Sequence, residues 1–498
     1  MFPFPSRHRS SAGRRTAAAA WSTAALAFAS LLFATLGIGA PQNLPDMGEP
    51  ADATLSPLEE QRLGAEFMRQ IRAGLPLVRD VQLEEYIQTL GMRLALASGK
   101  TGGRPFGFFI IDDESINAFA IPGGYVGINA GLIEAMEREE QLAGVVAHEV
   151  AHLTQRHHAR SFATGGRTSL SAAAAVLAAV LIGQASPEAG QAALAAGIAA
   201  TQQSTINFTR ANEIEADRIG IEILGNAQYD ATAMAESFSI LRRQNNLNTL
   251  ASGLEYLRTH PLDNDRIAEA ADRAAGQPVR PSVPQTDFTL FKARLAVLTS
   301  DDPAQLERSY RAKLDGGTQE RIGARYALAL GALRASRVAE AATHIDALER
   351  LAPAHPMVEL LRTDVLEASG EERGSREHLA ALADLYPERY SIVEKRVDQL
   401  MRAQRPGKAK DVVQRYLRDI DSPNPLAWRQ LAGIHQRLGD AAASHESLAR
   451  YFESLDELQS AESQLELALR NVVPGSQDEL RLRASLRTLR EEAARRRG

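Results

Sequence analysis

The first half of the chain opens with two helical patterns. Ser56, Pro57 and Glu59 form a capping box and a favourable first turn, so we expect a helix from here to about residue 72. Residues 81–97 carry leucine and isoleucine at the three-and-four spacing of a buried helical stripe. Both patterns predict amphipathic helices that pack on a core.

Strand-like patterns follow these helices. Residues 106–111 are predicted to form one strand, and residues 117–128 form two short strand-like pieces that Pro-Gly-Gly separates. A third helix is predicted over about residues 139–157, where apolar residues surround two histidines. We therefore expect a small sheet beside helices.

Beyond residue 284 the pattern becomes continuous amphipathic helix with regular breaks. Pro353 and Pro387 are 34 residues apart, and the same interval separates Thr363, Val397 and Leu431. This period is typical of tetratricopeptide-like repeats, in which each repeat is a pair of helices. We expect about three to five degenerate repeats between residues 288 and 473 and a charged final helix over 477–497, with an ordinary helical bundle as the alternative.

The first forty residues have the pattern of an export signal. A basic start precedes an apolar run from Ala17 to Ile38 and small residues around Gly39. We expect residues 1–40 to be a signal peptide and residues 41–55 a linker. An uncleaved membrane anchor is the alternative, because the run is about long enough to span a bilayer. Both interpretations place the rest of the chain outside the cytoplasm.

Composition narrows the chemistry that the chain can carry. Its 498 residues are enough for about two or three domains, each with its own core. The net charge of −6 and the lack of a basic stripe in the sequence argue against nucleic acid as a partner. The absence of cysteine excludes disulfides and thiolate metal sites. Any metal must therefore bind histidines and carboxylates.

A metal-binding motif lies in the predicted helix over 139–157, where residues 148–152 read His-Glu-Val-Ala-His. His148 and His152 are four positions apart, so both imidazoles can reach one zinc ion at about 2.0–2.1 Å. Glu149 is next round the helix and can act as general base on a water that the metal activates. Two polar histidines on a surface helix are the alternative, which the apolar neighbours disfavour.

A catalytic zinc site needs a third protein ligand and an open position for water. Residues 210–218 offer three carboxylates on one predicted helix. Glu213 and Asp217 are four positions apart and share a face, whereas Glu215 points away from both. We assign Glu213 as the third ligand and Asp217 as the acceptor of a hydrogen bond from a zinc histidine. A solvated acidic helix face is the alternative.

Two further features have no spacing that assigns them a role. His260 precedes Pro261, just before a helix that Asp263 is expected to cap, and a loop histidine of this kind is usually structural. The apolar stretch over residues 165–205 is either a helical hairpin packed on the core or a mobile flap that contacts a membrane surface or a partner.

These motifs together resemble the gluzincin metalloproteases that include the CAAX prenyl endopeptidase and the HtpX-like heat-shock proteases. The resemblance spans about residues 56–275. It rests on the edge segment Asn117–Gly124, the motif at 148–152, the pair Glu213 and Asp217, and His260-Pro261 with Arg266. With the repeat pattern, it implies a mainly α chain. A zincin-type metalloprotease domain of helices and a small sheet over 56–280 precedes an α-helical tetratricopeptide-like solenoid over 284–498.

The resemblance also implies a substrate-binding edge and supports the zinc ligands. It supports Glu213 as third ligand of one zinc ion (Zn2+) per chain. It implies that Asn117, Ala118 and Phe119 bind an extended substrate by strand addition, which suits an exposed sheet edge.

The resemblance places His260 near the zinc in one of two roles. The imidazole either stabilises the oxyanion or occupies the open position and holds the enzyme latent. Arg266 is a second candidate for stabilising the oxyanion.

The sequence patterns and the family resemblance together imply one of two functions. The first is a periplasmic zinc metalloendopeptidase that degrades unfolded or misassembled envelope proteins, in which residues 284–498 bind substrates or the outer-membrane assembly machinery. The second is a chaperone or assembly factor for outer-membrane proteins whose protease site is normally latent. The presence of Glu149 favours an active site, because a protein without chemistry has no need of a base.

Overall fold

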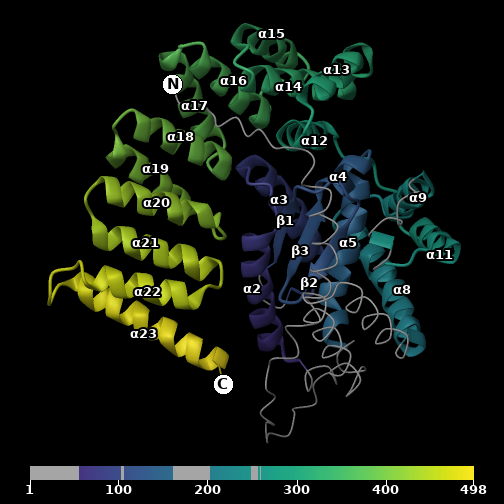
Figure 1. The fold of residues 1–498 in the computed structure, drawn as a ribbon, viewed down its shortest axis with the longest axis horizontal. Coiled ribbons are helices and arrows are strands. Elements are labelled where there is room, and N and C mark those ends of the chain that lie inside the picture. Colours follow the sequence, from purple (N-terminus) through teal and green to yellow (C-terminus); the bar gives the residue numbers. More distant parts are fainter. Residues whose placement is uncertain (1–54, 102–105, 161–201, 248–255, 258–259, 498) are drawn as a thin grey trace, which may run out of the picture. The chain divides into compact units, whose positions relative to one another are not determined.

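The computed structural model describes residues 55–101, 106–160, 202–247, 256–257 and 260–497 (Figure 1). The described residues belong to two compact units, one within residues 1–60 and 155–215 and the other within residues 61–154 and 216–498. The predicted signal peptide lies outside the described residues, as does most of the predicted linker and of the apolar stretch. Within the described ranges, no helix has both the length and the apolar character needed to span a membrane.

The elements before residue 280 are a small sheet and the helices around it. The predicted capping box is confirmed, because Ser56 N–H donates to Glu59 Oε2 at 2.7 Å and Glu59 N–H donates to Ser56 Oγ at 3.3 Å. The elements are α2 (Pro57–Gly74), α3 (Val81–Ala97), β1 (Gly107–Ile111), β2 (Ala118–Ile121), β3 (Tyr125–Asn129), α4 (Ala130–Ala135), α5 (Glu139–Thr154), α8 (Gln202–Asn226), α9 (Thr232–Leu247) and α11 (Asn264–Ala275).

The sheet has β3 at its centre, parallel to β1 and antiparallel to β2. The predicted Pro-Gly-Gly break is the turn between β2 and β3. Gly123 and Gly124 take φ angles of 88° and 99° there, a left-handed conformation that glycine adopts without strain. The strand order makes β2 an edge strand, and β2 packs on α5.

Helix α5 is the centre of this part of the fold. Every residue from Glu140 to Leu153 is buried. A Cβ added at Gly220 of α8 would lie 3.3 Å from the backbone nitrogen of His148, and one added at Gly144 of α5 would lie 3.1 Å from Met234 Cα of α9. The two glycines therefore let α8 and α9 approach α5 closely.

The predicted helix over 139–157 ends earlier than its apolar pattern indicates. Helix α5 stops at Thr154, and Arg156 takes a positive φ of 52°. The guanidinium of Arg156 is buried in the first unit, where it donates to Glu60 Oε2 at 3.1 Å and to Leu55 O at 2.6 Å. These hydrogen bonds compensate for a conformation that arginine rarely adopts. Apolar periodicity does not reveal a buried, hydrogen-bonded arginine of this kind. The predicted end of the helix was therefore wrong.

Beyond residue 284 the described chain is helical, and successive helices pack on one another in sequence order (Figure 1). The mainly α fold class with a small sheet is confirmed. The helices are α12 (Thr286–Thr299), α13 (Pro303–Ala312), the 3₁₀ helix η1 (Lys313–Asp315), α14 (Thr318–Arg334), α15 (Val338–Glu349), α16 (Pro356–Ala368), α17 (Glu372–Leu385), α18 (Tyr390–Arg402), α19 (Pro406–Asp419), α20 (Pro425–Arg437), α21 (Ala441–Ser454), α22 (Leu458–Leu469) and α23 (Gln477–Arg497).

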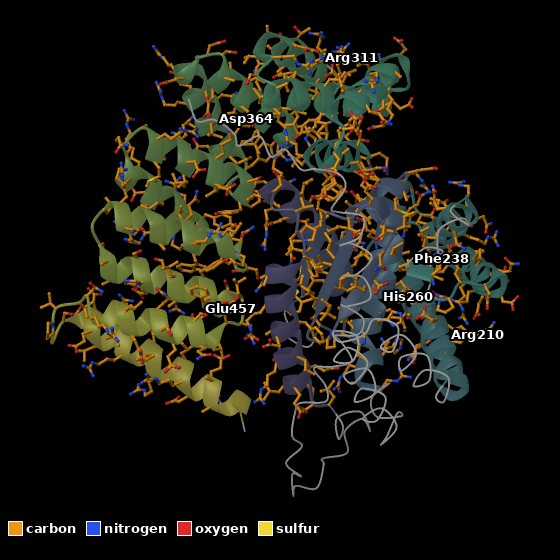
Figure 2. The ribbon with its side chains drawn as sticks, viewed as in Figure 1. Arg210, Phe238, His260, Arg311, Asp364 and Glu457 are labelled. Carbon is orange, nitrogen blue, oxygen red and sulfur yellow. The ribbon has the colours of Figure 1, made fainter. Side chains whose placement is uncertain are left out.

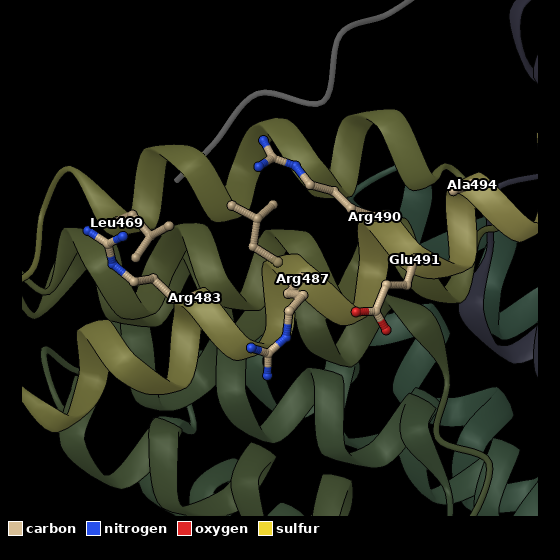
Figure 3. A pocket seen from close by; sticks show the side chains of 7 residues that line it. Leu469, Arg483, Arg487, Arg490, Glu491 and Ala494 are labelled. Atoms are coloured by element: carbon tan, nitrogen blue, oxygen red, sulfur yellow. The ribbon is translucent and has the colours of Figure 1, made fainter.

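The 34-residue interval in the sequence corresponds to one pair of helices. Thr363, Val397 and Leu431 lie on α16, α18 and α20, the first helices of three successive pairs, and all three are buried. The domain boundary at residues 280–284 stays a prediction. Near the end of the chain, a hollow of about 470 Å³ lies beside α22 and α23, and its lining includes Arg483, Arg487 and Arg490 (Figure 3).

Helix α3 of the sheet-containing part packs against α18 within the second unit. Glu85 accepts hydrogen bonds from Tyr390 N–H at 3.0 Å and from Ser391 Oγ at 2.7 Å. Glu84 and Glu394 lie near the same contact. Burial raises the pKa of each to about 7, and nearby carboxylates, including that of Asp80, add to the rise.

These two carboxyls predict a pH dependence of stability. Each keeps its proton in the folded state up to about pH 7, whereas in the unfolded chain it loses the proton near pH 4.5. The folded state therefore binds more protons between these values, so its stability decreases as the pH rises through this window. We expect the pair to lower the free energy of unfolding by an amount on the order of several kcal/mol across the window.

Urea denaturation across this pH range measures the effect. The double variant Glu84→Gln/Glu394→Gln should show a flatter stability profile than the wild type, because neither glutamine titrates. Equal slopes in the two proteins would contradict the prediction.

Candidate metal centre

His148 and His152 lie one turn apart on α5, as their spacing predicts. Their Nε2 atoms are 3.0 Å apart, and the two ring planes meet at 69°. His148 is fully buried and His152 is 7% exposed. Both side chains therefore present a ring nitrogen to the same buried point.

Asp217 holds His148 in this orientation. Its Oδ1 lies 2.9 Å from His148 Nδ1. This contact assigns the ring proton to Nδ1 and leaves the lone pair of Nε2 for a metal. Helix α8 thus presents a carboxylate to α5 at the point where Gly220 lets the two helices approach.

Arg266 of α11 binds Asp217 from the other side. Its Nε donates to Asp217 Oδ2 and its Nη2 donates to Asp217 Oδ1, each at 2.8 Å, in a bidentate pair. Asp263 caps α11 as expected and accepts a hydrogen bond from Arg266 N–H at 2.8 Å. Burial raises the pKa of Asp217, but the hydrogen bonds and charges of His148 and Arg266 outweigh it and hold that pKa below its usual range.

His260, labelled in Figure 2, completes the cluster of ring nitrogens. Its Nδ1 is 3.3 Å from His148 Nε2, and its ring centroid is 5.2 Å from those of both His148 and His152. Glu213 lies on α8, one turn before Asp217. One ligand atom from each of His148, His152, Glu213 and His260 lies within 4.8 Å of the others, and all four residues are buried.

This donor set fits zinc. Three imidazole nitrogens and one carboxylate oxygen are ligands that zinc accepts in tetrahedral sites. Nitrogen atoms 3.0 and 3.3 Å apart in a buried site are well placed for a cation between them, because a bound cation satisfies several lone pairs at once. The second contact of His148, to Asp217, is the outer hydrogen bond that zinc histidines usually have.

Glu149 lies beside the cluster and is fully buried. Among the described residues, neither of its carboxylate oxygens has a hydrogen-bond partner. Its Oε1 is 3.6 Å from Nε2 of His260, which is too long for a hydrogen bond. A buried carboxylate without hydrogen bonds is costly, and such groups concentrate at sites where a substrate or a proton is handled.

The remaining predicted residues lie around the cluster. The predicted substrate-binding residues lie at the start of β2: Asn117 directly precedes the strand, and Ala118 and Phe119 are its first two residues. Strand β2 packs on α5. Asn129 N–H donates to Asn117 O at 2.9 Å. Since hydrogen-bonded and non-hydrogen-bonded pairs alternate in an antiparallel ladder, Ala118 and Ala120 turn their backbone N–H and C=O groups away from β3. Ala118 is fully buried there, whereas Ala120 is partly exposed.

Sequence reasoning missed two aromatic residues at the site. Phe238 of α9, which is labelled in Figure 2, has its ring 6.2 Å from the ring of His148. The guanidinium carbon of Arg266 lies 5.5 Å from the ring of Phe238. Tyr256 stacks on His260 with ring centroids 4.7 Å apart and an angle of 26°. The spacing of four between Tyr256 and His260 is the only sequence signal that pointed to the second contact.

Loss of the Asp217 charge should weaken metal binding. We expect Asp217→Asn to lower zinc affinity by about 10- to 100-fold, because His148 loses the carboxylate that orients its ring and increases its basicity. Competition with a chromogenic chelator measures the affinity. Glu222→Gln, on an exposed part of α8, is the matched control and should bind zinc as the wild type does. Unchanged affinity in Asp217→Asn would mean that the contact does not support the metal.

Comparison with known proteins agrees with this geometry. Residues 81–274 match Peptidase family M48. The β-barrel assembly-enhancing protease of Yersinia pestis is 34% identical over 418 residues, which cover 82% of this chain and 84% of that protein. The β-barrel assembly-enhancing protease of Escherichia coli is 33% identical over 434 residues, which cover 85% of this chain and 88% of that protein.

A more distant relative matches a smaller part of the chain. The mitochondrial metalloendopeptidase OMA1 of Schizosaccharomyces pombe is 29% identical over 182 residues, which cover 36% of this chain and 50% of that protein. The family match spans the histidine motif, the α8 carboxylates and His260, which are the residues that build the buried cluster. The chain therefore belongs to Peptidase family M48, the family of the β-barrel assembly-enhancing proteases, and is a zinc metalloendopeptidase.

Proposed function

We propose that this metalloendopeptidase acts in the bacterial cell envelope and degrades misfolded or misassembled outer-membrane proteins. The names of its relatives in Yersinia pestis and Escherichia coli refer to the assembly of β-barrels. Their similarity covers 82% and 85% of this chain, so it includes both the metal centre and most of the helical region. This extent supports a shared role for the whole chain and a periplasmic location after export.

In this proposal His148, His152 and Glu213 hold one zinc ion. These residues offer two neutral imidazoles and a carboxylate, the ligand set expected of a catalytic site in which one position stays open. When bound, zinc supplies Lewis-acid chemistry that polarises a peptide carbonyl and makes a water molecule nucleophilic near neutral pH. Asp217 and Arg266 act through His148 and keep its Nε2 aimed at the site.

Glu149 is the proposed general base, and its buried carboxylate without hydrogen bonds is the observation that carries the proposal. No described residue competes for its oxygens, so the carboxylate is ready to accept a proton from the attacking water. The same oxygen then delivers the proton to the leaving amine nitrogen. Because the side chain is anchored on the buried helix α5, the transfer needs little rearrangement.

His260 is proposed to close the metal site in the resting enzyme. Its Nδ1 is 3.3 Å from His148 Nε2, and it shares a cluster with the three proposed ligands, so its imidazole is within reach of the position that substrate needs. This observation also favours a second candidate function, an assembly factor whose protease stays latent until a partner displaces His260. Stabilisation of the oxyanion by His260, or by Arg266, remains the alternative role.

The edge strand β2 is the proposed substrate-binding strand. Ala120 is partly exposed and turns its backbone groups away from β3, and an extended peptide can pair with it as an added strand. Strand addition needs an unfolded segment, which agrees with misassembled proteins as substrates. The helical region over 284–498 is proposed to bind these substrates or the outer-membrane assembly machinery. The proposed contact of residues 165–205 with a membrane surface concerns a stretch that is mostly outside the described residues.

The proposed role of Glu149 as general base is tested by replacing its carboxylate with an amide. We expect Glu149→Gln to keep about one zinc per chain and to lower the rate of casein cleavage by at least about 100-fold, because the amide cannot accept the proton. Zinc content and proteolysis are measured on the mature protein, with Glu222→Gln as a charge-matched control. Cleavage by Glu149→Gln at the wild-type rate would overturn the assignment. Zinc in both proteins without cleavage by either would favour the latent assembly factor.

The substrate-binding edge is tested by removing one outward N–H. Ala120→Pro removes the backbone N–H that points away from β3, whereas Ala120→Ser keeps this N–H. We expect kcat/KM for an extended peptide to fall about fivefold in the proline variant, which corresponds to about 1 kcal/mol for one backbone hydrogen bond, and to change little in the serine variant. Equal values for the two variants would exclude backbone pairing at this edge.

A further inference from the structure

We propose that Tyr256 is a positioning residue that fixes the imidazole of His260 at the metal cluster and links it to the substrate-binding edge strand. The proposal rests on the proposed function of this site and adds a residue that the motifs of the sequence do not assign.

Tyr256 contacts His260 through both its ring and its backbone. The two rings stack with centroids 4.7 Å apart and an angle of 26°. His260 N–H donates to Tyr256 O at 2.8 Å. Tyr256 is 1% exposed and belongs to the main hydrophobic core, so its ring is a fixed surface. A stack on one face and a backbone hydrogen bond together restrict both the position and the plane of the imidazole.

The stack with Tyr256 sets the plane of the His260 imidazole so that its nitrogens face the cluster of His148, His152 and Glu213. His148 and His152 meet the imidazole edge-on, at interplanar angles of 80° and 64°. In this orientation His260 Nδ1 lies 3.3 Å from His148 Nε2, and Nε2 lies 3.6 Å from Glu149 Oε1. Rotation of the imidazole out of the stack moves Nδ1 away from His148 and Nε2 away from Glu149. Tyr256 therefore acts through His260.

Tyr256 also contacts the segment that leads into the edge strand. Its N–H donates to Ile116 O at 3.3 Å. Ile116 directly precedes Asn117, where the pairing of β2 with β3 begins. A peptide that pairs with β2 at Ala120 therefore binds four residues along the chain from Ile116, which accepts the hydrogen bond of Tyr256. Substrate that binds at β2 can therefore shift Tyr256 and, through Tyr256, the position of the His260 imidazole.

The test is a double-mutant cycle in the mature full chain, with zinc affinity from chelator competition as the main readout. Tyr256→Leu removes the stack, Tyr256→Phe keeps it, and His260→Ala removes its target. We expect Tyr256→Leu to weaken zinc binding by about tenfold, Tyr256→Phe to remain within about twofold of the wild type, and the double variant Tyr256→Leu/His260→Ala to match His260→Ala alone. The change in kcat for casein should have the same sign in Tyr256→Leu and His260→Ala.

Additive effects of Tyr256→Leu and His260→Ala would overturn the proposal, because a purely structural tyrosine acts independently of His260. Equal losses in Tyr256→Phe and Tyr256→Leu would also overturn it. Tyr229→Leu is the matched control, since Tyr229 is also 1% exposed in the same core but donates to Glu139 instead of contacting the cluster. This control should lose stability and keep its zinc affinity.

Tyr256→Met serves if the leucine variant does not fold. Failure of this proposal remains distinct from failure of the proposed function. If substitutions of Tyr256 leave zinc affinity unchanged, only the proposal for Tyr256 fails, and the test of Glu149→Gln still stands. If the wild type binds no zinc, the proposed metal centre itself is wrong.

Discussion

The close approach of α8 to α5 is the constraint on which the metal centre depends. The histidine motif on α5 supplies two ring nitrogens, and α8 carries Asp217, which orients His148, and Glu213, the proposed third ligand. Gly220 allows this approach, because any side chain there would meet Met234 and the backbone of His148. Asp217 then reaches His148 Nδ1 at 2.9 Å, and Arg266 fixes Asp217 from the far side. The orientation of His148 thus follows from helix packing.

Burying these charged groups has a cost that stability does not explain. Asp217 and Arg266 are 5% and 3% exposed, and a buried ion pair of this kind seldom adds net stability. Their bidentate geometry fixes Asp217 Oδ1 against His148 Nδ1. This is useful only if His148 Nε2 has a function, such as binding a metal ion. Glu149 is more extreme, because it is fully buried without a hydrogen bond from any described residue. Metal binding by His148 accounts for the first feature, and the proposed proton transfer by Glu149 accounts for the second.

The sequence predicted those parts of the structure that depend on local periodicity. The spacing of His148 and His152, and of Glu213 and Asp217, placed each pair on one helix face. It could not predict where α5 ends, because the positive φ of Arg156 depends on hydrogen bonds to residues about a hundred positions earlier. Tyr256 was missed for a related reason. Its importance lies in stacking on His260 and in a backbone contact with Ile116, and neither leaves a periodic pattern.

The central claim is that the buried cluster binds a single catalytic zinc ion. Anomalous diffraction from crystals of the zinc-loaded protein, collected on both sides of the zinc absorption edge, tests this most directly. We expect one strong anomalous peak per chain, about 2.0–2.2 Å from nitrogen atoms of His148 and His152 and a carboxylate oxygen of Glu213. A cluster without a peak in zinc-loaded crystals, or a peak whose ligands exclude Glu213, would contradict it.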